Sequence, residues 1–194
     1  MDCFAPFLRW LPALAAVSLA AACGGAPSAT RAPSPPVGVE RYFPLIDGTI
    51  YTYQAQTPHG PEAFMIRVRR VGPDTAQLRT DAGLRTLAVR SDSIQRAGGG
   101  FVLRAPLQKG ASWQGDKGVV RVIDDNQRIT VPAGTFQGCL QTVEEVGGDA
   151  RGRITTSYCP EVGIVSLLVE EWHGADQISQ LTELRAFGPP TDLR

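Results

Sequence analysis

The chain has 194 residues, with 19 basic and 19 acidic side chains and no formal net charge at pH 7. The absence of a basic excess argues against a nucleic-acid partner, because proteins that bind nucleic acids carry a positive field. About 150 residues remain beyond the N-terminal segments described next, which suits one domain with its own core.

The first 22 residues have the pattern of an export signal. Arg9 precedes an uncharged and largely apolar stretch, WLPALAAVSLAAA, over 10–22. As a helix this stretch would span about 20 Å, which is less than the ~30 Å of a bilayer's hydrocarbon core. We therefore predict a signal peptide over 1–22 that is removed, rather than a transmembrane helix.

A cysteine ends this apolar stretch. Ala20-Ala21-Ala22-Cys23 resembles the lipobox of bacterial lipoproteins, with alanine where a large aliphatic residue is usual three positions before the cysteine. The resemblance implies that the Cys23 thiol receives a diacylglycerol, that cleavage makes Cys23 the first residue, and that the membrane is a partner. Gly24, rather than an aspartate, implies the outer membrane, facing the periplasm. The alternative is an ordinary signal peptide that leaves Cys23 as a free thiol.

The segment after the cysteine is predicted to be a tether. GGAPSATRAPSPPVGV, over 24–39, is rich in proline and glycine and has little to bury, which is typical of disordered linkers. We therefore expect a lipidated, disordered tether over 23–39 and a folded domain over 40–187. Residues 188–194 are predicted to be a disordered tail.

The domain is predicted to be all-β. Ala63–Val71 shows the typical alternation, with Phe64, Ile66 and Val68 on one face of a strand. Turn residues separate such stretches, which predicts a single antiparallel domain of about 10 short strands in a curved sheet or half-barrel. The candidate strands are Thr49–Ala55, Ala63–Val71, Thr75–Arg79, Leu84–Arg90, Phe101–Ala105, Val119–Asp124, Gln127–Val131, Phe136–Val146, Arg151–Tyr158, Ile164–Trp172 and Gln177–Phe187.

A short basic strip lies on the second of these strands. Arg67, Arg69 and Arg70 are interpreted as a solvated sheet face, with a contact to an acidic headgroup or partner as the alternative. Replacing Arg69 or Arg70 by alanine is then expected to change stability by less than ~0.5 kcal/mol.

Four sequence patches resemble a known class of domain. YFPLIDGTIYTY, PLQKGASW, VPAGTFQGC and YCPEVGIV, between Tyr42 and Val165, are similar to uncharacterised exported bacterial domains sometimes labelled TapB-like. The chain departs from that class at Tyr51, where tryptophan is expected, and at Cys159, where alanine is expected. The resemblance implies a curved antiparallel sheet in an exported protein, and no activity. PLIDGTIY and PLQKGASW also match each other, as one turn used twice or as a duplicated half-domain.

No catalytic or metal-binding pattern is recognised in the sequence. His59 and His173 lie in separate turns, without ligand partners at metal-binding spacing. The acidic pairs 124–125, 144–145 and 170–171 lie on strands, where neighbouring side chains point to opposite faces, so they are interpreted as solvated strand ends. We expect no catalytic residues, no cofactor and no metal.

Cys139 and Cys159 are predicted to form a disulfide, which exported proteins retain. If 136–146 and 151–158 form a hairpin with Val146 opposite Arg151, the cysteines lie one residue out of register. An odd-length loop or a bulge would place them opposite, within bridging distance. The alternative is two buried free thiols.

The sequence leaves three functions to compare. The preferred one is a non-catalytic, membrane-anchored lipoprotein whose exported domain has a structural or binding role in the cell envelope, with an envelope protein as a possible partner. The alternative is a carrier or sensor of an apolar ligand, a lipid or an acyl chain, inside a curved half-barrel. A hydrolase is disfavoured, because the sequence shows no catalytic constellation.

Overall fold

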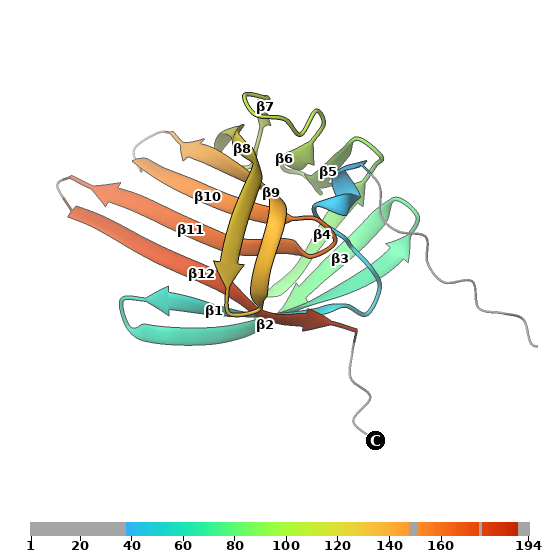
Figure 1. Ribbon diagram of the computed structural model, residues 1–194, viewed down its shortest axis with the longest axis horizontal. Coiled ribbons are helices and arrows are strands. Elements are labelled where there is room, and N and C mark those ends of the chain that lie inside the picture. The colour runs from blue at the N-terminus through green and yellow to red at the C-terminus, as the bar shows by residue number, and fades with distance from the viewer. Residues whose placement is uncertain (1–37, 148–150, 175, 190–194) are drawn as a thin grey trace, which may run out of the picture. The chain divides into compact units, whose positions relative to one another are not determined.

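The computed structural model describes residues 38–147, 151–174 and 176–189, which form an antiparallel β-domain with one short 3-10 helix, η1 (Gly38–Arg41) (Figure 1). Twelve strands form one sheet in the order β6-β5-β4-β3-β2-β1-β12-β11-β10-β9-β8-β7. They are β1 (Ile50–Thr57), β2 (Gly60–Gly72), β3 (Thr75–Thr80), β4 (Gly83–Val89), β5 (Ser93–Arg96), β6 (Phe101–Arg104), β7 (Ser112–Gln114), β8 (Gly118–Val131), β9 (Gly134–Val146), β10 (Arg151–Cys159), β11 (Gly163–His173) and β12 (Asp176–Gly188). No helix within the described ranges is long and apolar enough to cross a membrane.

The prediction of an all-β domain with a curved sheet is confirmed. The predicted strands differ from the observed ones in two ways: two short strands were missed, and one long strand was predicted as two. β5 and β7 were not predicted, because four and three residues are too few to show an alternating pattern. The candidates 119–124 and 127–131 are one strand, β8, because a set of β-bulges, and not a turn, lies between them. There the Asn126 amide donates to the Asp124 carboxylate at 3.0 Å.

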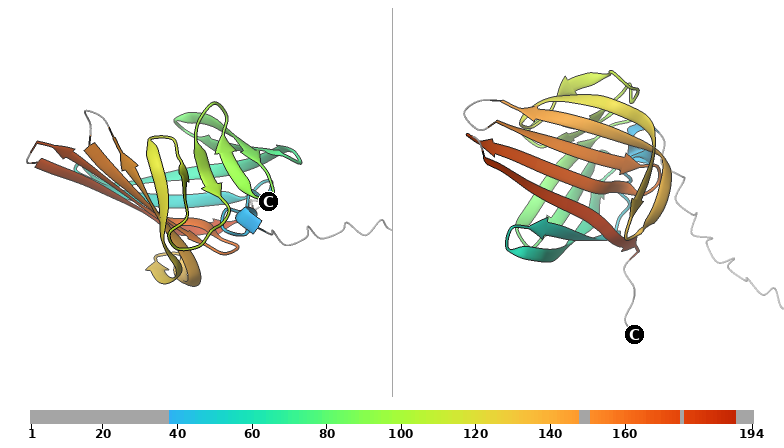
Figure 2. Two further views of the ribbon diagram at one scale, coloured as in Figure 1. Left: turned by 90° about the horizontal axis from the view of Figure 1, so that it is seen from above. Right: turned by 60° about the vertical axis from the view of Figure 1, so that its left-hand side comes forward.

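The sheet curls until its two edge strands, β6 and β7, come close together (Figures 1 and 2). Glycine makes this approach possible. A Cβ built on Gly100, which precedes β6, would lie 1.9 Å from the carbonyl oxygen of Gly115, which follows β7. An ion pair between Arg96 and Asp116 joins the same two regions, with 2.5 Å between Nη1 and Oδ2. The curled sheet therefore encloses an interior, as a half-barrel or nearly closed barrel does.

The long β8–β9 hairpin leaves the sheet partway along its length. β9 pairs with β10 only as far as Leu140, and beyond that point it pairs with β8 alone. At the hairpin tip the Ala133 amide donates to the carbonyl of Leu184 on β12 at 3.0 Å. The outer part of the hairpin therefore runs past β10 and β11 to reach β12 (Figure 1).

The structure contains the predicted Cys139–Cys159 disulfide, with 4.2 Å between the Cα atoms. It lies where β9 separates from β10. The predicted register was wrong by one residue, because Val146 pairs with Gly152 and not with Arg151. The connection between Val146 and Gly152 therefore has an odd number of residues. In this register Cys139 lies directly opposite Cys159.

The two similar segments, PLIDGTIY and PLQKGASW, form the same turn. Gly48 and Gly110 have φ angles of 80° and 89°, a backbone conformation that favours glycine. Their amides donate to the carbonyls of Val68 and Val122, at 3.0 and 2.9 Å. One turn leads into β1 and the other into β7, so each begins a run of six consecutive strands.

The basic strip on β2 is only partly a solvated face. Arg67 and Arg69 are exposed, as predicted. The interpretation of Arg70 was wrong, because its half-buried side chain lies on the inner side of the strand. Arg70 forms an ion pair with Glu40 of η1 at 2.7 Å, and its Nε–H donates to the carbonyl of Gly72 at 3.1 Å.

Candidate functional site

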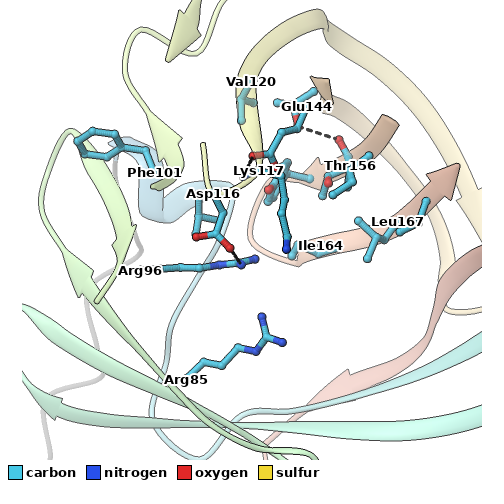
Figure 3. A pocket seen from close by; sticks show the side chains of 15 residues that line it. Arg85, Arg96, Phe101, Asp116, Lys117, Val120, Glu144, Thr156, Ile164 and Leu167 are labelled. Atoms are coloured by element: carbon cyan, nitrogen blue, oxygen red, sulfur yellow. Dashed lines mark hydrogen bonds and ion pairs between the residues drawn. The ribbon is translucent and has the colours of Figure 1, made fainter. Parts of the chain in front are cut away.

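A cavity of about 290 Å³ lies inside the curled sheet (Figure 3). Strands from both halves of the sheet form the walls of the cavity. One side is formed mainly by β10 and β11, and the other by β4, β5 and β6. Most of the lining is apolar, with side chains of Phe101, Val120, Ile154, Ile164, Leu167 and Val169.

Strand register brings the apolar residues of β10 and β11 onto one face. Val169 pairs with Ile154, and Leu167 pairs with Thr156, two positions further along. Side chains two residues apart on a strand share a face, so all four point into the cavity. Leu168 lies between them and points to the outer face of the sheet.

The Thr142 and Tyr158 hydroxyls in the cavity wall are hydrogen-bonded or held neutral. The Thr142 hydroxyl donates to the carbonyl of Thr156 at 3.4 Å, and both threonines are buried. Burial raises the pKa of the Tyr158 hydroxyl far above its ordinary value, because a low-dielectric environment disfavours the charged phenolate. Tyr158 is therefore a neutral hydroxyl at physiological pH.

Charged side chains also line the cavity (Figure 3). They come from β4, β5, β9 and the turn between β7 and β8. Arg96 forms its ion pair with Asp116 across the closure of the sheet. A Glu144 carboxylate oxygen accepts the amides of Lys117 and of the following glycine, at 2.5 and 3.0 Å. The guanidinium of Arg85 and the amino group of Lys117 point into the space between the walls.

The residues weighed from the sequence lie mostly outside this cavity. His59 is exposed in the turn between β1 and β2, whereas His173 is exposed at the end of β11 and not in the predicted turn, with its Nε2 3.6 Å from a Glu171 oxygen. The interpretation of Glu144 as part of a solvated strand end was wrong, since it is half-buried and lines the cavity. No group of three or more His, Cys, Asp and Glu side chains in the described ranges could hold a metal ion.

The cationic residues of the cavity were missed in the sequence, although they leave a signal there. Arg85 shares one face of β4 with Leu87 and Val89, both of which are buried. Arg96 shares one face of β5 with the fully buried Ile94. On a strand whose one face is buried, alternation predicts apolar residues at every position of that face. Arg85 and Arg96 occupy such positions, and both line the cavity.

Comparisons with known proteins give two structural neighbours and no family. No family description and no curated protein matches the chain. One solved structure is described as an exported protein with a YmcC-like fold from Bacteroides fragilis, 13% identical, with a TM-score of 0.48. Another is described as a lipoprotein from Parabacteroides distasonis, 16% identical, with a TM-score of 0.43. Each match covers 76% of this chain and 98% of the other. At these TM-scores neither likeness supports an argument about function, and none of the comparisons confirms the TapB-like resemblance.

Proposed function

We propose that the protein is a non-catalytic, lipid-anchored protein of the bacterial cell envelope whose β-domain binds an apolar or amphiphilic ligand inside its curled sheet. The cavity carries this proposal. Its volume of about 290 Å³ lies at the lower end of the range for ligand pockets, and an apolar lining with a few convergent polar groups is typical of such sites.

The exposure of the cavity wall distinguishes a binding site from an ordinary core. Ile154, Ile164, Leu167 and Val169 lie on the inner face of central strands, yet each is only half-buried. Leu184, on the neighbouring strand β12, is fully buried. Apolar side chains on an inner face gain about 25 cal/mol per Å² when they leave water, so a ligand with an apolar part completes this interior.

The state of the cavity's polar groups supports binding rather than catalysis. A nucleophile needs a base within hydrogen-bonding reach. The two carboxylates have other partners, since Asp116 pairs with Arg96 and Glu144 accepts two backbone amides. Tyr158 stays protonated.

Anchoring through Cys23 is the second part of the proposal. Its support is the apolar stretch over 10–22, the lipobox-like Ala20–Cys23 and the proline-rich segment 24–39. Residues 1–37 lie outside the described residues, whereas Gly38 and Val39, which were predicted to belong to the tether, are part of η1, and Val39 is buried. Stable anchoring needs more than one chain, and a lipobox cysteine carries two or three. The wild-type protein should sediment with outer membranes, and Cys23→Ala should not. An unacylated, freely soluble wild-type protein would contradict anchoring but leave the binding proposal intact.

The binding proposal is tested with an apolar probe and a pair of matched variants. Unacylated full-length protein (Cys23→Ala) is titrated with the neutral dye N-phenyl-1-naphthylamine, whose fluorescence rises in apolar surroundings. Leu167→Trp fills the cavity, whereas Leu168→Trp places the same side chain on the outer face.

We expect the parent and Leu168→Trp to bind the probe, and Leu167→Trp to bind at least ~10-fold more weakly, which corresponds to about 1.4 kcal/mol. Circular dichroism confirms that each variant is folded, and Val169→Phe is a smaller filling substitution if Leu167→Trp does not fold. No binding by the parent, or equal binding by all folded variants, would contradict the proposal.

A further inference from the structure

The charges at the cavity point to a particular class of ligand, and this inference rests on the proposed function. Five charged side chains line the cavity: Arg85, Arg96, Asp116, Lys117 and Glu144. Three are cations and two are anions, so the lining carries a net positive charge. The chain as a whole carries none, so the excess is a local feature of this site.

The partners of these groups show which charges remain for a ligand. Arg96 and Asp116 neutralise each other in an ion pair at 2.5 Å. Glu144 is held by two backbone amides, one of them that of Lys117, at 2.5 and 3.0 Å. Within the described ranges, Arg85 and the Lys117 amino group take part in none of the ion pairs. Arg85 and Lys117 are therefore the cations without an ion-pair partner in the lining, and Glu144 keeps one negative charge among them.

The position of the two cations makes them suited to one end of an amphiphile. In Figure 3 the guanidinium of Arg85 and the amino group of Lys117 approach the cavity from different elements and point into the same space. In the same view Ile164 is labelled beside the Lys117 amino group, and Leu167 lies farther to the right. A ligand whose head lies between the two cations therefore has aliphatic side chains next to it for its chain.

We infer that the ligand is a single-chain amphiphile with an anionic head, a carboxylate or a phosphate monoester, held between Arg85 and Lys117. Arg85 and Lys117 are both exposed at the cavity, and hydrogen bonds between ionised partners are about twice as strong as neutral ones. The chain lies along Ile154, Ile164, Leu167 and Val169. A volume of about 290 Å³ favours one chain over the two of a diacyl lipid.

Competition among three eight-carbon compounds tests this inference. Octanoate, octyl phosphate and 1-octanol share one chain and differ in the head. Each displaces N-phenyl-1-naphthylamine from the unacylated full-length protein. We expect at least one anion to bind ~10-fold more tightly than the alcohol, which is the effect of one charge-assisted hydrogen bond. The preferred anion identifies the head as carboxylate or phosphate.

Substitutions locate the preference. Arg85→Gln and Lys117→Gln should each weaken anion binding ~5- to 10-fold and leave 1-octanol binding unchanged. The matched controls are Arg79→Gln on the adjacent strand β3 and Lys109→Gln, both exposed and outside the cavity lining. They should behave like the parent.

The possible failures are distinguishable. If the parent binds neither the probe nor any of the three compounds, the proposed function fails. If 1-octanol binds as tightly as both anions, or if anion binding survives both cavity substitutions unchanged, binding in the cavity stands and the anionic head is wrong.

Discussion

Arg70 shows that the face of a strand on which a side chain lies decides its role. Arg69 and Arg70 are neighbours on β2, but only Arg70 lies on the inner side, where it pairs with Glu40 at 2.7 Å. Its guanidinium also donates to the carbonyls of Gly72 and Pro73, at 3.1 and 2.5 Å. Arg70 therefore ties η1 to β2, while Arg69 makes no such connection.

Alanine substitutions should separate these two arginines. Arg70→Ala removes the ion pair and two hydrogen bonds from a half-buried site, and we expect a loss of about 1–2 kcal/mol in the free energy of unfolding. Arg69→Ala should change it by less than ~0.5 kcal/mol. Urea unfolding of both variants measures the difference, and equal effects would mean that the Arg70 contacts contribute nothing.

Three buried tyrosines link stability to high pH. Burial raises the pKa values of Tyr51, Tyr53 and Tyr158 well above their ordinary 10. The Tyr51 and Tyr53 hydroxyls donate to backbone carbonyls at 3.0 and 2.8 Å. In the folded protein all three therefore stay protonated at pH values where the unfolded chain ionises.

The sign of the pH dependence follows from this difference. The contribution of the three hydroxyls is fully present below pH 10 and is lost as the pH rises above it. Between pH 9 and pH 10.5 the free energy of unfolding should fall by about 2–3 kcal/mol. Urea unfolding at the two pH values measures this fall, and Tyr53→Phe should reduce it by about a third. A flat profile in the parent would show that the phenols reach solvent.

At the scale of elements, the disulfide fixes the point where β9 leaves the sheet. Leu140 is the last β9 residue paired with β10, and Cys139 lies next to it. Gly138 has a φ of 67°, as the glycine of a G1 bulge does. The bond joins residues 20 apart, and a loop of that size predicts about 3 kcal/mol of stabilisation on the chain-entropy view.

Removing both cysteines tests that contribution. The variant Cys139→Ala/Cys159→Ala should lose about 3 kcal/mol in the free energy of unfolding. The parent under reducing conditions should approach the same value. Non-reducing peptide mapping of exported protein should recover the two cysteines in one linked peptide pair, whereas quantitative alkylation without reduction would show that the bond does not form in the cell.

Elements that could be predicted from sequence are those with a long alternating pattern. β2 showed period two clearly, over Ala63–Val71. The candidate Ile164–Trp172 was correctly predicted to be a strand, and as β11 it lies inside the sheet, between β10 and β12. β5 and β7 are too short for a pattern, and the length of the β9–β10 loop, which sets the register, depends on turn geometry that composition does not reveal.

At the scale of the whole molecule, closure of the sheet creates the site. Arg96 and Asp116 are 20 residues apart, and they meet only because β6 and β7 come together. Lys117 and Arg85 reach one cavity for the same reason. The sequence predicted a curved sheet, and it left open a carrier of an apolar ligand as an alternative function. It did not predict that Arg85, Arg96, Asp116 and Lys117 meet at one cavity, because this depends on how far the sheet curls.

The central claim, that the ligand binds inside the curled sheet, is tested most directly by methyl NMR of the unacylated full-length protein during titration with N-phenyl-1-naphthylamine. The account predicts that methyl resonances of Ile154, Ile164, Leu167 and Val169 shift, while those of Leu168 and the exposed Val119 on the outer face do not. Shifts confined to the outer-face methyl groups, with the four interior residues unchanged, would contradict it.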